Sequence, residues 1–217
     1  MLITGANRGI GLELARQYAA KDWNVIATTR RPVDDKGTAE LRDIQKAHPN
    51  LVIERVDVTD SAMIRSVAAK YKDQPLDVLI NNAAAVEATF QADLDKVNIP
   101  YDKIDFDAAR NDFDVNTLGP MRMIQAFMPN IEKGRQKKIV NVTSFIGSYD
   151  KGGSPMGMNY GASKAGLNMY SYKLHHALKG KGVVVALVEP IMVQSKPGVE
   201  KIPMSKPVGE EVARLVT

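Results

Sequence analysis

Short runs of β-branched and aliphatic residues alternate along this chain with longer segments of helical spacing, and this alternation limits its possible folds more than any other feature. Strand-like runs occupy residues 25–29, 51–53, 78–80, 138–142 and 183–188. Between the strand-like runs, Ile10, Leu14 and Tyr18 recur at i, i+4 and i+8, as the apolar residues of a helix do. Strand–helix–strand alternation predicts a parallel sheet, and the nearly continuous apolar runs predict strands that are buried on both faces.

A chain of 217 residues suits one α/β domain, so we expect residues 1–217 to form a single domain. We predict an α/β fold, a Rossmann-like doubly wound parallel sheet with helices on both faces. Three stretches interrupt the alternation: residues 84–107, 145–158 and 190–207. Ligands bind at the carboxyl ends of strands in open α/β sheets, so these loops should border the site, with 190–207 as the substrate loop.

The composition excludes several classes of function. Cysteine is absent, which excludes disulfides, thiolate catalysis and cysteine-ligated metals, and no metal site is expected. The formal charge is only +4 and the basic residues form short pairs rather than tracts, so no nucleic-acid partner is expected. No apolar run approaches the ~18 residues of a membrane span, and a glycine motif stands where a signal peptide would, so we expect a cytoplasmic protein without a membrane partner.

A glycine-rich loop lies between the first predicted strand and the first predicted helix. It reads Thr-Gly-Ala-Asn-Arg-Gly-Ile-Gly over residues 4–11. Glycines in such a loop permit a tight turn and a close backbone approach to a pyrophosphate, which then meets the positive end of the helix dipole. The context favours a dinucleotide site over a functionless turn. Its predicted ligands are Gly5, Asn7, Arg8, Gly9, Ile10 and Gly11.

The residues that follow the second predicted strand indicate whether the cofactor is NAD(H) or NADP(H). An NAD site usually has an acidic residue there, bonded to the ribose 2′-hydroxyl, but this chain has Arg30. Arg30 and Arg8 could pair with a 2′-phosphate through their planar guanidinium groups, which predicts NADP(H) as the cofactor. The alternative is a surface arginine that merely ends a strand.

Tyr160 and Lys164 have the i, i+4 spacing that places two side chains on one face of a helix. Ser144 follows the strand at 138–142 and should face the same crevice as the glycine loop. These residue types suit carbonyl reduction, in which a tyrosine donates a proton while hydride reaches the carbonyl carbon. The tyrosine pKa is normally ~10, and a nearby ammonium is expected to lower it. Ser144 is expected to orient the substrate oxygen.

With these motifs in family order, the chain resembles the short-chain dehydrogenase/reductase family, and within it the branch of sniffer-like and C-factor-like carbonyl reductases. The resemblance rests on the glycine loop, Asp57-Val58-Thr59, Asn81-Asn82-Ala83-Ala84, Asn116, Ser144-x-x-Gly147, Tyr160-x-x-x-Lys164 and Pro190-x-x-Val193-x-Ser195.

The resemblance implies further roles. Asp57 and Val58 should contact the adenine, and Asn82 and Ala83 the adenosine side. Asn116 should kink its helix and join a proton relay to Lys164, which should also bond the nicotinamide ribose, beside Tyr160. Pro190, Val193 and Ser195 should meet the nicotinamide. Taken singly, Asp57 could instead cap a helix, Asn82 could form a turn, and Asn116 could lie on a helix surface.

The chain also departs from the family pattern. Ile191 replaces the usual glycine after Pro190, and Ala84 replaces the glycine of Asn-Ala-Gly. Ser144 and Tyr160 are 16 residues apart, so the loop between them should bulge over the pocket. Both ends look short, and six strands are expected where the family has seven.

These features predict an NADPH-dependent reductase of an aldehyde, ketone or quinone. The substrate should be apolar or aromatic, because the predicted pocket is rich in methionine and aromatic residues. The alternative is a non-catalytic NADP-binding regulator or scaffold. A homodimer or homotetramer is expected through helices at 106–130 and 158–179, which carry apolar residues such as Met121, Met123 and Phe127 on more than one face. The predicted pocket residues are Phe145, Tyr149, Met156, Met158, Met192 and Met204. The alternative is that they are ordinary loop and core residues, because methionine often only fills gaps.

Overall fold

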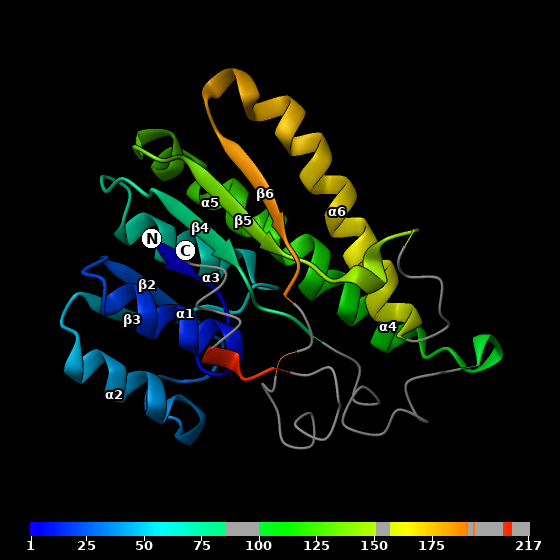
Figure 1. Ribbon diagram of the computed structural model, residues 1–217, viewed down its shortest axis with the longest axis horizontal. Helices are drawn as coiled ribbons and strands as arrows, with labels where there is room; N and C mark the ends of the chain where they lie inside the picture. Colours follow the sequence, from blue (N-terminus) through cyan, green and yellow to red (C-terminus); the bar gives the residue numbers. More distant parts are fainter. Residues whose placement is uncertain (86–99, 151–156, 191–192, 194–205, 210–217) are drawn as a thin grey trace.

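The computed structural model describes residues 1–85, 100–150, 157–190, 193 and 206–209. Its centre is a six-stranded parallel sheet in the order β3-β2-β1-β4-β5-β6 (Figure 1). The predicted α/β class, the parallel sheet and its six strands are therefore confirmed. The strands are β1 (Leu2–Ile3), β2 (Val25–Thr29), β3 (Leu51–Arg55), β4 (Val78–Asn81), β5 (Lys138–Val142) and β6 (Val184–Val188).

Strands β2 and β3 lie on one side of β1, and β4, β5 and β6 lie on the other. The direction in which successive strands are added therefore reverses between β1 and β4. Loops that leave these two neighbouring strands diverge to opposite faces of the sheet and leave a crevice at its carboxyl edge. The glycine loop follows β1, and Asn82 follows β4. The predicted cofactor residues thus flank the topological switch point of the sheet.

Helices cover both faces of the sheet and enclose two hydrophobic cores. One core contains Ile3 and Ala27 and lies under α1 and α2, and the other contains Leu2 and Leu79 and lies under α3, α5 and α6. Figure 1 shows β6 at one edge of the sheet beside α6, and β3 at the other edge beside α2. The helices are α1 (Gly9–Ala19), α2 (Ala39–Ala47), α3 (Ser61–Lys70), α4 (Phe106–Phe113), α5 (Gly119–Lys133) and α6 (Met158–Leu178).

The short strand β1 holds its place because both of its residues are fully buried between two partners. Leu2 pairs with Ile26 and Leu79 and faces the second core, while Ile3 faces the first. Alternate residues of a strand point to opposite faces, so one-residue slippage would exchange the two cores. Apolar burial on both faces therefore sets the register that presents the glycine loop.

The predicted helix at 106–130 is interrupted. A π-helical segment, Asp114–Leu118, separates α4 from α5 and contains Asn116. A π-helical turn adds one residue and redirects the helix. The kink that the family resemblance implied at Asn116 has this form.

Met123 and Phe127 lie inside the molecule. The structure buries both side chains of α5 in the core with α3, so neither is available to a subunit interface, contrary to the expectation from sequence. The outer apolar side chains of this region are instead Phe106 and Phe113 of α4, with Met169, Tyr170 and Tyr172 of α6. Within the described residues, no helix has the length and hydrophobicity that crossing a bilayer requires.

Candidate active site

The glycine loop adopts backbone conformations that only glycine tolerates easily. Gly5 and Gly9 have φ angles of +66° and +56°. A Cβ atom on Gly5 would lie 2.9 Å from the Cα of Ala83, and one on Gly11 would lie 2.4 Å from the carbonyl oxygen of Gly5. The loop is thus folded back tightly against both the start of α1 and the residues after β4.

Asn82 and Thr4 join the glycine loop to the end of β4. The Asn82 amide donates hydrogen bonds to the carbonyl oxygens of Thr4 (2.9 Å) and Gly5 (3.2 Å). The Thr4 hydroxyl accepts from the backbone N–H groups of Asn82 and Ala83, each at 3.0 Å. Asn82 therefore joins the ends of β1 and β4 and is not an isolated turn residue. Its side-chain amide fixes the conformation of the glycine loop.

The first turn of α1 is suited to an anion. Its N-cap residue, Arg8, is extended and makes no capping hydrogen bond with its own side chain, and no acidic residue occupies the first turn. Free N–H groups and the helix dipole together favour a phosphate. Asn7 donates to the carbonyl oxygen of Gly37 at 3.0 Å, which ties the loop to the segment after β2. Ile10 packs on the first core.

Two exposed arginines, Arg30 and Arg55, lie together at the ends of β2 and β3. The Arg55 Nε donates to the carbonyl oxygen of Arg30 at 3.3 Å, and the charges of both side chains act on Asp57. Arg31, by contrast, forms an ion pair with Asp35 at 3.1 Å. The carboxyl ends of β2 and β3 therefore carry positive charge from Arg30 and Arg55. Arg31 does not add to it, because its charge is paired with Asp35.

Asp57 forms a local turn rather than a helix cap. Its Oδ1 accepts hydrogen bonds from the N–H (2.9 Å) and the hydroxyl (2.7 Å) of Thr59, whereas Asp60 caps α3. Burial opposes ionisation of Asp57, but the Thr59 hydrogen bonds and the nearby arginines outweigh it and lower the pKa of the carboxyl. The Val58 side chain is buried in the second core, which leaves the backbone of Val58 as the part able to meet an adenine.

Lys164 is buried at the carboxyl edge of the sheet, and Tyr160 lies one turn before it on α6. The Lys164 Nζ donates to the carbonyl oxygen of Val142 at 2.8 Å and lies 5.6 Å from the centre of the Tyr160 ring. Ser144 follows β5, and its side chain forms a hydrogen bond with that of Tyr160. The structure thus brings Ser144, Tyr160 and Lys164 together, although 16 residues separate the first two in sequence.

The pKa values differ from the sequence-based expectation. Burial, with a smaller contribution from the charge of Asp112, raises the pKa of Tyr160 to about 12, and the hydrogen bond from Ser144 opposes the rise. Desolvation lowers the pKa of Lys164 to about 8. The expectation of a lowered tyrosine pKa is therefore wrong for this arrangement. The ammonium is itself desolvated and donates to Val142, while a carboxylate acts on the phenol.

Asn116 is fully buried, so it is not a helix-surface residue. Its side-chain oxygen accepts from the N–H of Ala85, and its amide nitrogen donates to the carbonyl oxygen of Ala85, both at 2.8 Å. The same nitrogen lies 3.0 Å from the hydroxyl of Ser163, which in turn donates to the carbonyl oxygen of Tyr160 at 2.7 Å. Asn116 therefore joins the segment after β4 to the turn of α6 that carries Tyr160.

Sequence reasoning missed two residues of this network. Ser163 links Asn116 to α6, and Asp112 is a carboxylate that is only 1% exposed. The spacing of Asp112 and Asn116 at i, i+4 on one helix could have indicated a shared face. That signal is weak, because nothing in the sequence shows that α4 packs against α6.

Several predicted residues lie at the margin of the described chain. Pro190 is partly buried after β6, and Val193 is buried and forms a parallel bridge with Lys206. Of the predicted substrate pocket, Phe145 and Met158 are partly buried, whereas Tyr149 is 95% exposed. The predicted residues outside the described residues are Ser195, Ile191, Met156, Met192 and Met204.

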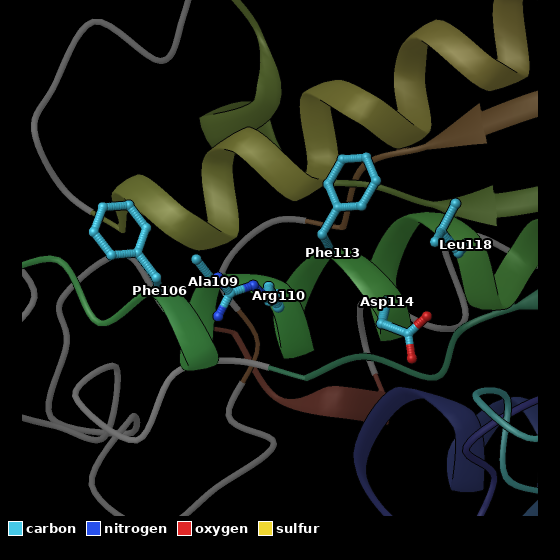
Figure 2. Close-up of a pocket in the computed structure, with 6 residues that line it drawn as sticks. All are labelled: Phe106, Ala109, Arg110, Phe113, Asp114 and Leu118. Carbon is cyan, nitrogen blue, oxygen red and sulfur yellow. The ribbon is translucent and has the colours of Figure 1, made fainter.

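An open groove of about 530 Å³ runs along α4, apart from the glycine loop. Figure 2 shows the rings of Phe106 and Phe113 projecting from the same side of this helix. A Cβ atom on Gly166 of α6 would lie 2.9 Å from the Phe113 ring, so the groove borders the contact between α4 and α6. Within the described part of the chain, no cluster of three or more His, Asp or Glu side chains could hold a metal ion.

Known proteins are similar to this chain in sequence and in fold. Residues 1–204 match the family described as short chain dehydrogenase. The short-chain dehydrogenase/reductase atnB of Arthrinium sp is 34% identical over 87% of this chain and 72% of its own. The 1-hydroxy-2-glutathionyl-2-methyl-3-butene dehydrogenase of Rhodococcus is 31% identical over 89% of this chain and 77% of its own.

Solved structures agree with this assignment. The NADPH-bound carbonyl reductase from chicken fatty liver has a TM-score of 0.84 at 28% identity, covering 99% of this chain and 88% of that one. The carbonyl reductase Sniffer of D. melanogaster has a TM-score of 0.85 at 24% identity, over 99% and 88% of the two chains, and supports the fold. A tight glycine loop, an uncapped helix start and a 3-2-1-4-5-6 sheet fit the nicotinamide dinucleotide that this family uses. The chain therefore belongs to the short-chain dehydrogenase/reductase family and is an oxidoreductase of that family.

Proposed function

We propose that this protein is an NADPH-dependent carbonyl reductase that acts on an apolar or aromatic aldehyde, ketone or quinone. The observation that carries the proposal is the grouping of Ser144, Tyr160 and Lys164 at the edge of the sheet that also holds the glycine loop. A protein that merely bound a dinucleotide would have no need of a positioned phenol beside a buried ammonium.

Tyr160 acts as the proton donor in this proposal. Its hydroxyl keeps its proton through neutral pH, because its pKa is about 12, and a protonated donor is the form that carbonyl reduction requires. Bound NADPH supplies the hydride that the carbonyl carbon receives. Ser144 orients the carbonyl oxygen and stabilises the negative charge that develops on it, through the hydroxyl that also bonds Tyr160.

Lys164 and Asn116 support the donor. The Lys164 ammonium, with a pKa of about 8, lies close enough to the phenol to stabilise the phenolate as the proton leaves. Asn116 holds the backbone at Ala85 and, through Ser163, the turn of α6 that carries Tyr160. These two residues position the proton donor.

The cofactor preference is proposed from charge. Arg30 is exposed at the end of β2 and Arg8 at the start of α1, and no acidic residue stands at the end of β2 to bond a ribose 2′-hydroxyl. A guanidinium pairs with phosphate through two parallel hydrogen bonds, so this corner favours NADPH over NADH. NADPH is also the cofactor named for the chicken carbonyl reductase. Asp57, Val58, Asn82 and Ala83 complete the proposed adenosine side, and Pro190, Val193 and Ser195 the nicotinamide side.

We also propose a homodimer through the outer faces of α4 and α6. Phe106 and Phe113 are exposed on α4, Met169, Tyr170 and Tyr172 are exposed on α6, and the two helices pack against each other. Exposed apolar patches mark interaction surfaces. Sedimentation analysis of the wild type beside Phe106→Asp checks the proposal. A dimer that dissociates in the variant supports it, and a wild-type monomer at micromolar concentration contradicts it.

The test of the enzymatic proposal is NADPH oxidation with a panel of aldehydes, ketones and quinones. Tyr160→Phe should lower kcat/KM by at least about a hundredfold, the usual contribution of a positioned acid, while the Kd for NADPH stays within a few-fold of wild type. Tyr101→Phe, an exposed position outside the site, serves as the matched control and should retain full activity. Tight NADPH binding without turnover by the wild type would instead support a non-catalytic NADP-binding regulator.

A further inference from the structure

The guanidinium of Arg55 lies at the carboxyl end of β3, and the proposed function gives it no role. Strands β2 and β3 are paired up to this point, because Thr29 is the register partner of Arg55 and the N–H of Val56 donates to the carbonyl oxygen of Thr29 at 2.9 Å. The Arg55 Nε then donates to the carbonyl oxygen of Arg30 at 3.3 Å. The side chain of Arg55 therefore reaches across to the end of β2 and is bonded to the backbone of Arg30.

Most of the hydrogen-bonding capacity of this guanidinium is unused. An arginine side chain has five N–H groups in a planar fork, and the bond to Arg30 takes only the one on Nε. Within the described residues, the two terminal amino groups of Arg55 form no hydrogen bond and no ion pair. The side chain is also exposed. Arg55 is therefore oriented by the protein and still able to bind an anion from solution.

The acidic residues that neighbour Arg55 in sequence are used elsewhere. Glu54 accepts hydrogen bonds from the ammonium of Lys70 at 2.7 Å and from the hydroxyl of Tyr71 at 2.9 Å. The Asp57 carboxylate accepts both hydrogen bonds of its own turn. Neither carboxylate forms an ion pair with Arg55 in the part of the chain that the structure describes. The positive charge of Arg55 therefore remains available at the ends of β2 and β3.

A second cation at this place suits the charge of a phosphate monoester. Such a group carries about −1.5 to −2 charges at pH 7, so a single guanidinium balances only part of it. Arg31, which follows Arg30, cannot supply the remainder, because it is paired with Asp35. Arg55 can, since its free amino groups offer the parallel N–H donors that bind two phosphate oxygens at once.

We propose that Arg55 is a second cofactor-specificity residue, whose terminal amino groups bind the 2′-phosphate of NADPH together with Arg30 while its Nε holds the backbone of Arg30 in place. The inference rests on the proposed function, because only a cofactor with a 2′-phosphate would use this pair of cations. It extends the phosphate site from the residue that follows β2 to the end of β3. NADH has a hydroxyl at the same position, so Arg55 contributes to the choice between the two cofactors and little to the affinity for NADH.

The test measures binding and requires no turnover. The Kd values for NADPH, NADH and adenosine 2′,5′-bisphosphate are determined by calorimetric titration of the wild type and of Arg55→Gln, which removes the charge at an exposed position. We expect the Kd values for NADPH and for the bisphosphate to rise by at least about tenfold, the usual effect of one charged hydrogen bond, and the Kd for NADH to stay within about twofold. The control is Arg65→Gln, an exposed arginine of α3, which changes the net charge equally and should leave all three values unchanged.

A second variant separates direct contact from charge alone. Arg55→Lys keeps the charge but loses both the planar fork and the Nε bond to Arg30, so it should recover only part of the affinity for NADPH. Full recovery by lysine, or an unchanged ratio of NADPH to NADH affinity in Arg55→Gln, overturns the proposal. A wild type that prefers NADPH but reduces no carbonyl compound would overturn the reductase and leave the Arg55 contact standing. A wild type that binds NADH as tightly as NADPH overturns both.

Discussion

The Lys164 ammonium lies 5.6 Å from the centre of the Tyr160 ring but donates its hydrogen bond to the carbonyl oxygen of Val142, 2.8 Å away. The lysine therefore acts on the tyrosine through space and not through a direct hydrogen bond. Desolvation lowers the pKa of Lys164 to about 8, so the ionised ammonium is held at an energetic cost near pH 7. Desolvation also raises the pKa of Tyr160 to about 12, which keeps the phenol neutral at that pH. The consequences of this arrangement can be measured.

Replacing Lys164 with methionine should stabilise the fold while it impairs the reaction. The pKa falls from 10.5 to about 8 on folding, so the unfolded chain binds this proton more tightly and ionised Lys164 costs about 3 kcal/mol near pH 7. The substitution removes this cost but also removes the hydrogen bond to Val142, which stabilises the fold by about 1 kcal/mol. We therefore expect the free energy of unfolding to rise by about 2 kcal/mol near pH 7, measured by urea denaturation.

The sign of the Lys164 effect depends on pH. Above pH 10.5 both states are neutral at this position, so only the lost hydrogen bond to Val142 remains and the variant should be about 1 kcal/mol less stable than the wild type. The stabilisation should appear and grow as pH falls from 10.5 toward 8. Lys173→Met, at an exposed position of the same helix, is the control and should change stability little at any pH. A Lys164→Met variant that is less stable than the wild type near pH 7 would contradict the assigned cost of burial.

Arg30→Ala should weaken NADPH binding and leave NADH binding nearly unchanged. A charged hydrogen bond to phosphate contributes about 1.5–3 kcal/mol, so the Kd for NADPH should rise by at least about tenfold. Arg31→Ala is the matched control, because Arg31 already pairs with Asp35 and should matter much less. Fluorescence titration of both cofactors checks the prediction, and equal weakening of NADH and NADPH would argue against a 2′-phosphate contact.

Asn116→Ala should lower both stability and activity. The substitution leaves the N–H and the carbonyl oxygen of Ala85 without their amide partner, and each unsatisfied group costs about 1–3 kcal/mol where it is shielded from water. The turn of α6 that carries Tyr160 also loses its link through Ser163. Asn111→Ala, at an exposed position of α4, is the control. Thermal unfolding together with kcat would show the effect, and an unchanged kcat would remove Asn116 from the proposed site.

Gly147→Ala should disturb Lys164 from a position distant in sequence. A Cβ atom on Gly147 would lie 2.8 Å from both the backbone carbon and the Cβ of Lys164, closer than real contacts allow. Overpacking of this kind costs about 1–3 kcal/mol and should shift α6 enough to lower kcat. A Cβ atom on Gly180 would meet nothing within 4 Å, so Gly180→Ala should stay within about 0.5 kcal/mol of wild type. Equal stability of the two variants would show that α6 can shift near Lys164 and accommodate the added methyl group without cost.

Much of the architecture could be predicted from the chain alone. The apolar runs at 25–29 and 138–142 became β2 and β5, because inner strands that are buried on both faces must be largely apolar. The run at 51–53 became β3, although Val52 is 40% exposed at the edge of the sheet. The Asp60 cap of α3 is a local feature of the same kind, since its carboxylate accepts from the N–H groups two and three positions further on. The Thr4–Gly11 loop was also evident, because a left-handed backbone at Gly5 and Gly9 is a local requirement.

What the sequence by itself determined is therefore local: strands, helix starts, the glycine turn, and the i, i+4 pairing of Tyr160 with Lys164. Tertiary packing alone decided that Met123 and Phe127 face inward, that Asn116 bonds Ala85, and that Asp112 lies buried near Tyr160. A pKa depends on desolvation and on charges brought close through space, and neither has a signature in residue spacing. For this reason the sequence predicted a lowered pKa for Tyr160, and only the packing of α4 against α6 revealed a raised one.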